Sequence, residues 1–236
     1  MNRATLKAEA RGQLLGHYGV FIRIFIMTQL ISLFLLQLID SICPSGTVGT
    51  VMYYIGVVLI ELLNGVLSAG AAYCYLQFSA GRDINFTDLF YCFKNHPDKA
   101  ILIEFCNLLA VTVCFLPAEL LLRLHKGSFE ISAILGIVGI FIIGAVAYLW
   151  YYLNFTFLFY LMHDFPDRSV WDLFRICYKS MDGYRLKLLA YQLSFLPYWI
   201  LGILSWGIGF CWINPYMNSS KVHFYLTMLE EKSQKA

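Results

Sequence analysis

Glu61 is the residue whose type and place in the chain best suit chemistry inside a membrane. It lies near the middle of an apolar run at 51–76, with Asn64 close to one helical turn further on, so both side chains point to one side of a helix. A carboxyl group at that depth costs about 2.5–3.5 kcal/mol on insertion scales, which makes it a functional candidate. Asn107, in another apolar run, is expected to face the same interior. The sequence thus predicts an intramembrane polar site of Glu61, Asn64 and Asn107.

Two interpretations of this site stay open. In the first, Glu61 is a proton- or cation-responsive group between helices, and Gln29 and Gln192 face the same interior. In the second, a protonated or hydrogen-bonded Glu61 holds helices together and does nothing else. Glu104 lies shallower, near Lys99, and is not counted in the site.

A second polar group lies where the apolar run at 132–161 ends. Its members are His163, Asp164, Asp167 and Arg168. These four residues are the best candidates in the chain for the polar groups of a membrane-embedded enzyme that acts on lipid or peptide at the cytoplasmic leaflet. Pro166 stands among them, and a loop that ends a helix explains such a segment more simply.

Other motifs of catalysis or metal binding do not occur in the sequence. The five histidines are scattered without a partner at i+3 or i+4, and there is no HExxH, GxSxG or Walker loop. The seven cysteines form no CxxC pair and are interpreted as small apolar packing residues. Only Cys43 and Cys211 are expected near the outer face, where a disulfide between them is the alternative. We expect no catalytic residue, no metal ion and no cofactor.

Long apolar runs must position all of these residues. Hydrophobic residues make up 59% of the chain and charged residues 14%, against roughly 45–50% and 25% in soluble domains. The excess is concentrated in runs of about 20 residues, the length that crosses roughly 30 Å of hydrocarbon. The runs lie near 20–39, 51–76, 100–122, 132–161, 186–206 and 208–220. They predict an all-α, polytopic membrane protein of about six transmembrane helices, with 1–236 as a single integral membrane domain.

Positive charge falls in alternate connectors between these runs. Of the 17 Lys and Arg residues, all but Arg23, Arg123 and Lys126 would share one side of the membrane if all six runs cross. This positive-inside bias predicts that both termini are cytoplasmic. The net charge is +2, and the basic residues are distributed by topology without forming a patch. No nucleic-acid partner is therefore predicted. Membrane lipids and other membrane proteins are the expected partners.

Two connectors on the predicted cytoplasmic side resemble each other. Asn85 and Ser169 can each cap the start of a helix. Asp88 and Asp172, three residues later, can accept a hydrogen bond from the backbone N–H of the capping residue. The helices so begun are amphipathic but too short to span, and are expected to lie flat at the interface. They cover 86–94, with the apolar face Phe86, Leu89, Phe90 and Phe93, and 170–181, with the apolar face Val170, Leu173, Phe174 and Cys177.

The N-terminal segment is interpreted as a third copy of this pattern. Mixed apolar and basic residues there lead to Gly16-His17-Tyr18 before the first long run, and Gly183-Tyr184 stands at the matching place before the fifth. The chain is therefore divided into three repeats, each an interfacial helix followed by a helical hairpin. The repeats are roughly 1–76, 84–161 and 168–229. Such repeats are common in membrane proteins that move one half against another, and gene duplication alone is the alternative explanation.

The last hairpin is the least regular. Gly207-Ile208-Gly209 breaks the fifth run, and Asn214-Pro215 resembles the N-cap and first residue of a final helix. Five spans would put Lys221 and the later lysines on the opposite side, so six are preferred. Aromatic residues of this region are expected to form an outer interfacial belt, with an aromatic ligand box as the alternative. They are Tyr198, Trp199, Trp206, Trp212 and Tyr216.

Three stretches of the chain carry a likeness to a known family. The first comprises Gly81-Arg82, Phe86-Thr87-Asp88-Leu89-Phe90 and Phe93-Lys94-Asn95, and the second Leu6-Lys7 with Leu14-Leu15-Gly16. The third and most specific runs from Leu201 to Gly209 and continues through Trp212, Pro215-Tyr216 and Phe224-Tyr225. Here the chain resembles a bacterial family of integral membrane proteins catalogued as domain of unknown function 975. The resemblance implies a multi-pass protein of the bacterial cytoplasmic membrane with six or so helices, no agreed activity and no catalytic residue.

Two classes of function follow from these observations. The leading prediction is a non-enzymatic membrane protein, either a scaffold or a transporter-like component, suggested by the three repeats and by Glu61. The alternative is a membrane-embedded enzyme that acts on lipid or peptide. A wet cavity lined by Glu61, Asn64 and Asn107 would favour transport, a dry core would favour a scaffold, and convergent polar groups at 163–168 would favour an enzyme.

Overall fold

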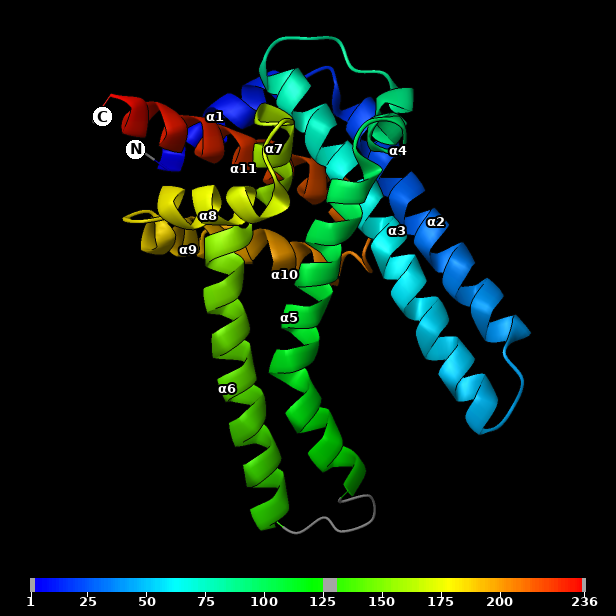
Figure 1. The fold of residues 1–236 in the computed structure, drawn as a ribbon. Coiled ribbons are helices and arrows are strands. Elements are labelled where there is room, and N and C mark those ends of the chain that lie inside the picture. The colour runs from blue at the N-terminus through cyan, green and yellow to red at the C-terminus, as the bar shows by residue number, and fades with distance from the viewer. Residues whose placement is uncertain (1–2, 125–130, 235–236) are drawn as a thin grey trace.

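Two long helical hairpins extend from a layer of shorter helices in the computed structural model, which describes residues 3–124 and 131–234 (Figure 1). The first hairpin is α2 (Tyr18–Ile42) with α3 (Thr47–Ser79), and the second is α5 (Pro97–Leu124) with α6 (Ile131–Phe155). The remaining helices are α1 (Arg3–Leu14), η1 (Phe86–Phe90), α4 (Tyr91–Lys94), α7 (Leu158–Asp164), α8 (Val170–Ser180), α9 (Arg185–Leu193), α10 (Leu196–Leu204) and α11 (Phe210–Ser233). The predicted all-α class is confirmed.

Five helical stretches are long and apolar enough to cross a membrane, judged by length and composition. They are Tyr18–Ile42, Thr47–Ser79, Pro97–Leu124, Ile134–Asp164 and Arg185–Leu204. The sixth predicted run, 208–220, lies in α11, which is not among them in the described part of the chain. Along α2, α5 and α6 large apolar side chains such as Phe34 and Ile143 are exposed, as expected of helices that lipid surrounds.

The predicted helix starts in the two similar connectors are confirmed. The Asn85 backbone N–H donates to the Asp88 carboxylate at 2.8 Å, and the Asp172 backbone N–H donates to Ser169 Oγ at 3.2 Å. These bonds satisfy N–H groups that a helix start would otherwise leave unpaired. The second connector then forms α8, close to the predicted 170–181, and buries Val170, Leu173 and Cys177 as predicted.

The first connector winds differently from the prediction. Phe86–Phe90 is a 3₁₀ helix and only Tyr91–Lys94 is α-helical. Leu89 and Cys92 are fully buried there, whereas Phe93 is 40% exposed. Of the predicted apolar face, Leu89 is buried and Phe86 and Phe90 pack partly buried against the core, whereas Phe93 is exposed beside Phe90. Leu89 belongs to the 3₁₀ helix and Cys92 to α4, so the change of winding between them alters which side chains share a face.

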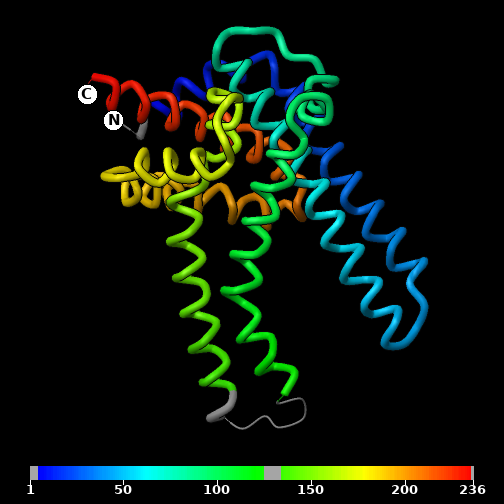
Figure 2. Tube along the Cα trace, in the orientation of Figure 1, coloured from blue at the N-terminus to red at the C-terminus, as the bar shows by residue number. Residues whose placement is uncertain are grey.

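The helices α9, α10 and α11 form a third hairpin that runs across the first two, as the traces in Figures 1 and 2 show. Helix α11 packs against α1, α2 and α3, and α9 packs against α6. The third hairpin is tied to α1 by Lys7, whose ammonium donates to the Ser194 carbonyl at 2.9 Å. The Arg11 guanidinium lies 5.5 Å from the centre of the Tyr216 ring.

These contacts correct the predicted aromatic belt. Tyr216 is buried beside Arg11, and the Tyr198 ring lies 5.7 Å from the Lys7 ammonium. The side chains of an interfacial belt face lipid, so the buried Tyr216 cannot belong to one. Trp199, Trp206 and Trp212 are exposed, as the predicted belt requires.

The start of the last helix was also predicted wrongly. α11 begins at Phe210, and Pro215 lies inside it. Ser205 Oγ accepts the Gly209 backbone N–H at 2.8 Å, which supports a helix start before Asn214. A proline this close to a helix start removes one intrahelical hydrogen bond, to the carbonyl four residues back.

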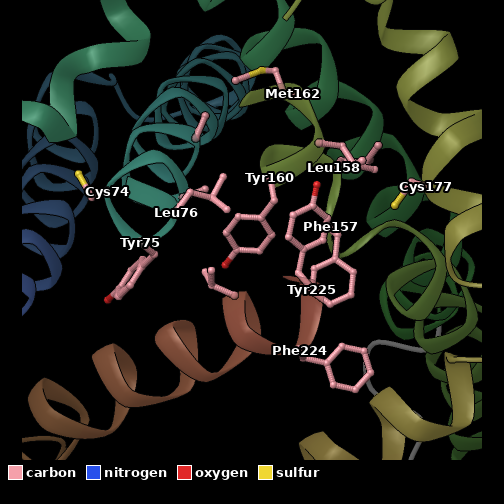
Figure 3. Close-up of a cluster of buried hydrophobic side chains, with 14 of the residues drawn as sticks. Cys74, Tyr75, Leu76, Phe157, Leu158, Tyr160, Met162, Cys177, Phe224 and Tyr225 are labelled. Atoms are coloured by element: carbon pink, nitrogen blue, oxygen red, sulfur yellow. The ribbon is translucent and has the colours of Figure 1, made fainter. Parts of the chain in front are cut away.

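The buried core lies in the layer of shorter helices. Figure 3 shows Leu76 of α3 beside Tyr160 of α7, with α11, which carries Phe224 and Tyr225, running below and Tyr75 of α3 to the left. All five side chains are less than a tenth exposed. This core contacts each long hairpin at one end only. Beyond it the two hairpins diverge, as Figure 2 shows.

Candidate functional site

A cavity of about 800 Å³ lies between the two long hairpins and α11. Its lining includes Glu61 and Asn64 from α3, Asn107 from α5 and Gln29 from α2. The structure therefore brings the three predicted site residues together around one space. Gln192 does not line the cavity directly, but its amide donates to the Tyr152 hydroxyl, which does, at 3.2 Å.

One wall of the cavity carries two carboxyl groups because α3 and α5 approach closely at Gly65. A Cβ atom added to Gly65 would lie 2.3 Å from Glu104 Cβ, so no larger residue fits there without movement. Glu61 lies one turn before Gly65 on the same helix and also lines the cavity. Glu104 thus joins the site, and Lys99, its expected neighbour, instead donates to the Arg168 carbonyl at 3.0 Å.

The sequence contains a signal for Glu104 that its shallow position concealed. Glu61 and Asn64 have the spacing Glu-x-x-Asn, and so do Glu104 and Asn107. In a helix, residues three apart share a face. Two such pairs on neighbouring helices therefore predict a shared polar surface.

Asn107 connects the second hairpin to the carboxyl groups. Its side-chain amide donates to Glu104 Oε2 at 3.2 Å, and its side-chain oxygen accepts from the Tyr151 hydroxyl of α6 at 2.8 Å. Asn64 is held in a similar way, because its side-chain oxygen accepts from Ser32 Oγ of α2 at 2.7 Å. Within the described residues, the Glu61 carboxylate has no hydrogen-bond or ion-pair partner and is only half-buried.

The lining of the cavity also includes a lysine whose charge the sequence analysis explained by topology alone. Lys221 of α11 lines the cavity, and its ammonium lies 3.1 Å from the Tyr152 hydroxyl of α6. Asn214 and Asn218 line the same cavity from α11. The spacing of these three residues places them on one helical face, a pattern that could have indicated the site.

The polar group at the end of α7 does not converge. His163 Nε2 lies 2.8 Å from the Ala69 carbonyl of α3, and the Asp164 carboxylate accepts from the Tyr225 hydroxyl of α11. Asp167 is exposed, and the Arg168 carbonyl accepts from Lys99. These residues bind three different helices and leave no common centre for a substrate.

No metal-binding group of three His, Cys, Asp or Glu residues occurs in the part of the chain that the structure describes. All seven cysteines are free thiols, including Cys43 and Cys211. The disulfide alternative for this pair is therefore not seen.

The fold and the cavity define a class of protein: an all-α protein whose long apolar hairpins are consistent with a membrane location and enclose polar groups. The chain belongs to the family described as protein of unknown function (DUF975), whose model matches residues 1–232. This confirms the family resemblance carried by the three stretches. The chain has no match among curated proteins or solved structures.

Proposed function

We propose that this chain is a transporter-like protein of the bacterial cytoplasmic membrane, which binds a small polar or amphipathic solute between its hairpins. One observation carries the proposal: Glu61, a carboxylate without a hydrogen-bond or ion-pair partner among the described residues, faces a cavity of about 800 Å³ within helices of membrane-spanning length. An ionisable group in such a place is expensive to keep and typically marks a solute or ion pathway.

The proposed membrane arrangement keeps both termini cytoplasmic and lets the third hairpin enter only part of the way. Tyr198 contacts α1 through Lys7, and Trp206 at the α10–α11 turn follows just over two helical turns later. At about 1.5 Å per residue this distance is roughly 12 Å, less than half of a hydrocarbon core of roughly 30 Å. A partial entry returns α11 to the side of α1, which agrees with the lysines in its second half.

The three-repeat division supports a moving assembly. Each hairpin is preceded by a short helix, namely α1, η1 with α4, and α8. Gly16 and Gly183, the matched positions before α2 and α9, both have positive φ, at 88° and 78°. Two hairpins stand side by side and the third crosses them, so a motion of the third hairpin would open or close the cavity that Lys221 lines.

Thiol labelling tests whether the cavity is wet. We would introduce Asn64→Cys into a variant without native cysteines, and treat the protein in lipid vesicles with a charged, water-soluble thiol reagent. The matched control is Leu33→Cys, because Leu33 is 62% exposed on the apolar surface of α2. We expect Asn64→Cys to react and Leu33→Cys to stay unmodified. An unreactive Asn64→Cys would favour a dry scaffold and would refute the transporter proposal.

Native mass spectrometry of the purified protein then identifies what the cavity holds. Compounds retained by the wild type are loaded into vesicles with and without the protein, and their passage is measured. Glu61→Gln is expected to abolish retention and passage, whereas Asp40→Asn, which removes an exposed carboxylate elsewhere on α2, is expected to change neither. Equal passage in vesicles that lack the protein would contradict transport.

A further inference from the structure

We infer that the solute is a zwitterion, with an ammonium group bound by Glu61 and Glu104 and an anionic group bound by Lys221. This inference rests on the proposed function, because it names the chemistry of the molecule that the cavity accepts. The cavity has an acidic pole on the two long hairpins and a basic pole on α11. A molecule with one charge could satisfy only one of the two poles.

Few hydrogen-bond donors reach the two carboxyl groups of the acidic pole, Glu61 and Glu104. Glu104 receives one hydrogen bond in the described structure, from the Asn107 amide at 3.2 Å, and Glu61 receives none. An ionised carboxylate offers about four acceptor positions, and half-buried carboxylates are costly when they stay unpaired. A primary ammonium group has three N–H donors and makes strong, charge-assisted bonds with carboxylates. It is therefore the group that completes this pole.

Few hydrogen-bond acceptors reach the Lys221 ammonium, which forms the basic pole. Lys221 Nζ lies 3.1 Å from the Tyr152 hydroxyl, and the Gln192 amide donates to the same oxygen at 3.2 Å. Lysine has three donors, and only one is directed at Tyr152. The Tyr152 hydroxyl also bonds the Thr156 side chain, so its own hydrogen-bonding positions are occupied within the protein. A phosphate or carboxylate group would accept from the remaining lysine donors.

An aromatic surface on α6 joins the two poles. The Tyr148 ring centre lies 6.4 Å from that of Tyr151 and 6.5 Å from that of Tyr152. Tyr151 contacts the acidic pole through Asn107, and Tyr152 contacts the basic pole. A cavity of this size and composition suits an amphipathic organic molecule better than a bare ion.

Two sources could supply this chemistry: a free zwitterion dissolved in water, or the head group of a zwitterionic lipid. The test includes an arm for each. Detergent-purified protein is mixed with equal amounts of phosphatidylethanolamine and phosphatidylglycerol, and retained lipid is measured by native mass spectrometry. Separately, thermal unfolding is followed with phosphoethanolamine, with ethanolamine and with inorganic phosphate, each at the same concentration.

We expect the wild type to bind at least one zwitterionic probe: phosphatidylethanolamine in preference to phosphatidylglycerol, or phosphoethanolamine in preference to its two fragments. Glu104→Gln and Lys221→Gln should each weaken that binding by roughly ten- to a hundredfold, the effect of losing one hydrogen bond to a charged group. Lys221→Arg keeps the charge and should retain most of the binding. Asp40→Asn and Lys94→Gln alter exposed charges outside the cavity and should retain all of it.

The outcomes separate the inference from the proposed function. Binding of the lipid alone identifies a head group as the source, and binding of phosphoethanolamine identifies the zwitterion itself; either result supports the inference. The inference would be overturned if ethanolamine or phosphate acted as strongly as phosphoethanolamine and the two lipids were also retained equally. If Asn64→Cys is labelled but no zwitterionic probe binds, the inference fails and the proposed function stands. An unlabelled Asn64→Cys overturns both.

Discussion

At the scale of single residues, Asn107 ties neighbouring helices together and Glu61 does not. Asn107 accepts a hydrogen bond from Tyr151 of α6 and donates one to Glu104 of its own helix. Glu61 has no such bond within the described residues. The interpretation in which a polar side chain only holds helices together therefore suits Asn107, and the ionisable interpretation suits Glu61.

The two residues are expected to respond differently to substitution. Asn107→Leu should lower the free energy of unfolding by about 0.5–2 kcal/mol, the range for hydrogen bonds between membrane helices. Glu61→Gln should leave it unchanged, because no partner is lost. Unfolding in mixed detergent, followed by circular dichroism, measures both. A Glu61→Gln protein that is less stable than Asn107→Leu would show that Glu61 is a structural residue.

His223 makes the α1–α11 contact sensitive to pH. Burial lowers the pKa of His223, and the nearby Glu9 carboxylate opposes this shift. His223 Nε2 donates to Gln13 Oε1 at 3.0 Å, and Nδ1 lies 4.0 Å from Glu9. Since the folded pKa is below the unfolded value, the unfolded chain takes up a proton first on acidification. The contribution of the neutral histidine is complete above about pH 6.5 and is lost below it.

We therefore expect the melting temperature in detergent to fall as the pH is lowered from 7.5 to 5.5, and to fall less in His223→Gln. Glu9, Glu230 and Glu231 line the same small hollow as His223. Measurements at both pH values on the wild type and the variant isolate the histidine. An identical decrease in the two proteins would exclude His223 as the cause.

At the scale of elements, close packing decides which helices pair. Gly144 of α6 lies against the backbone of α5, where an added Cβ would be 2.2 Å from the Cys114 carbonyl oxygen. A backbone atom cannot turn aside as a side chain can. Gly139, on the same helix, has no atom of the described residues within 4 Å of the corresponding position, apart from those of its own helix. The two glycines therefore form a matched pair, one in the helix contact and one outside it.

Gly144→Ala is expected to lower stability by about 1–3 kcal/mol, the usual cost of overpacking. Gly139→Ala should be neutral or slightly stabilising, because alanine is the better helix former. Thermal unfolding of the two variants in the same detergent provides the comparison. If Gly144→Ala were as stable as Gly139→Ala, α5 and α6 could not be packed as closely as the structure has them.

At the scale of the whole molecule, two hairpins standing together and a third lying across them produce a cavity with opposite charges on its walls. Glu61 and Glu104 come from the standing hairpins, and Lys221 comes from the crossing one. The crossing hairpin is held by α1 through Lys7 and Arg11. The N-terminal helix therefore sets the position of the basic pole, although it does not line the cavity.

This arrangement predicts a labelling pattern for single cysteines in a cysteine-free variant. Ser45→Cys, in the α2–α3 turn, should react with an impermeant reagent from outside, whereas Lys94→Cys and Lys232→Cys should react only after the membrane is opened. Trp206→Cys should also resist outside labelling, because the third hairpin ends short of that surface. Outside labelling of Lys232→Cys would refute the cytoplasmic C-terminus, and outside labelling of Trp206→Cys would restore six full spans.

Much of the architecture is local and is therefore readable from the sequence. The first five apolar runs, the break at residues 207–209 and the caps Asn85 and Ser169 depend on near neighbours in the chain, and they reappear in the structure. The spacing of Glu61 and Asn64 was enough to place them on one helical face. Helical type was harder to predict, because α-helical and 3₁₀ winding differ by less than one residue per turn.

The tertiary structure alone decided which distant residues meet. Lys221 was read as a topological charge, and only the crossing of α11 brings it to Tyr152. Glu104 belongs to the site because Gly65 allows α3 and α5 to approach closely. His163 does not join an enzyme-like group because its ring contacts the Ala69 carbonyl. Hydropathy and capping act between near neighbours, whereas these contacts depend on the angle at which whole hairpins pack. That angle is set by side chains from several segments at once, and so no single stretch of sequence contains it.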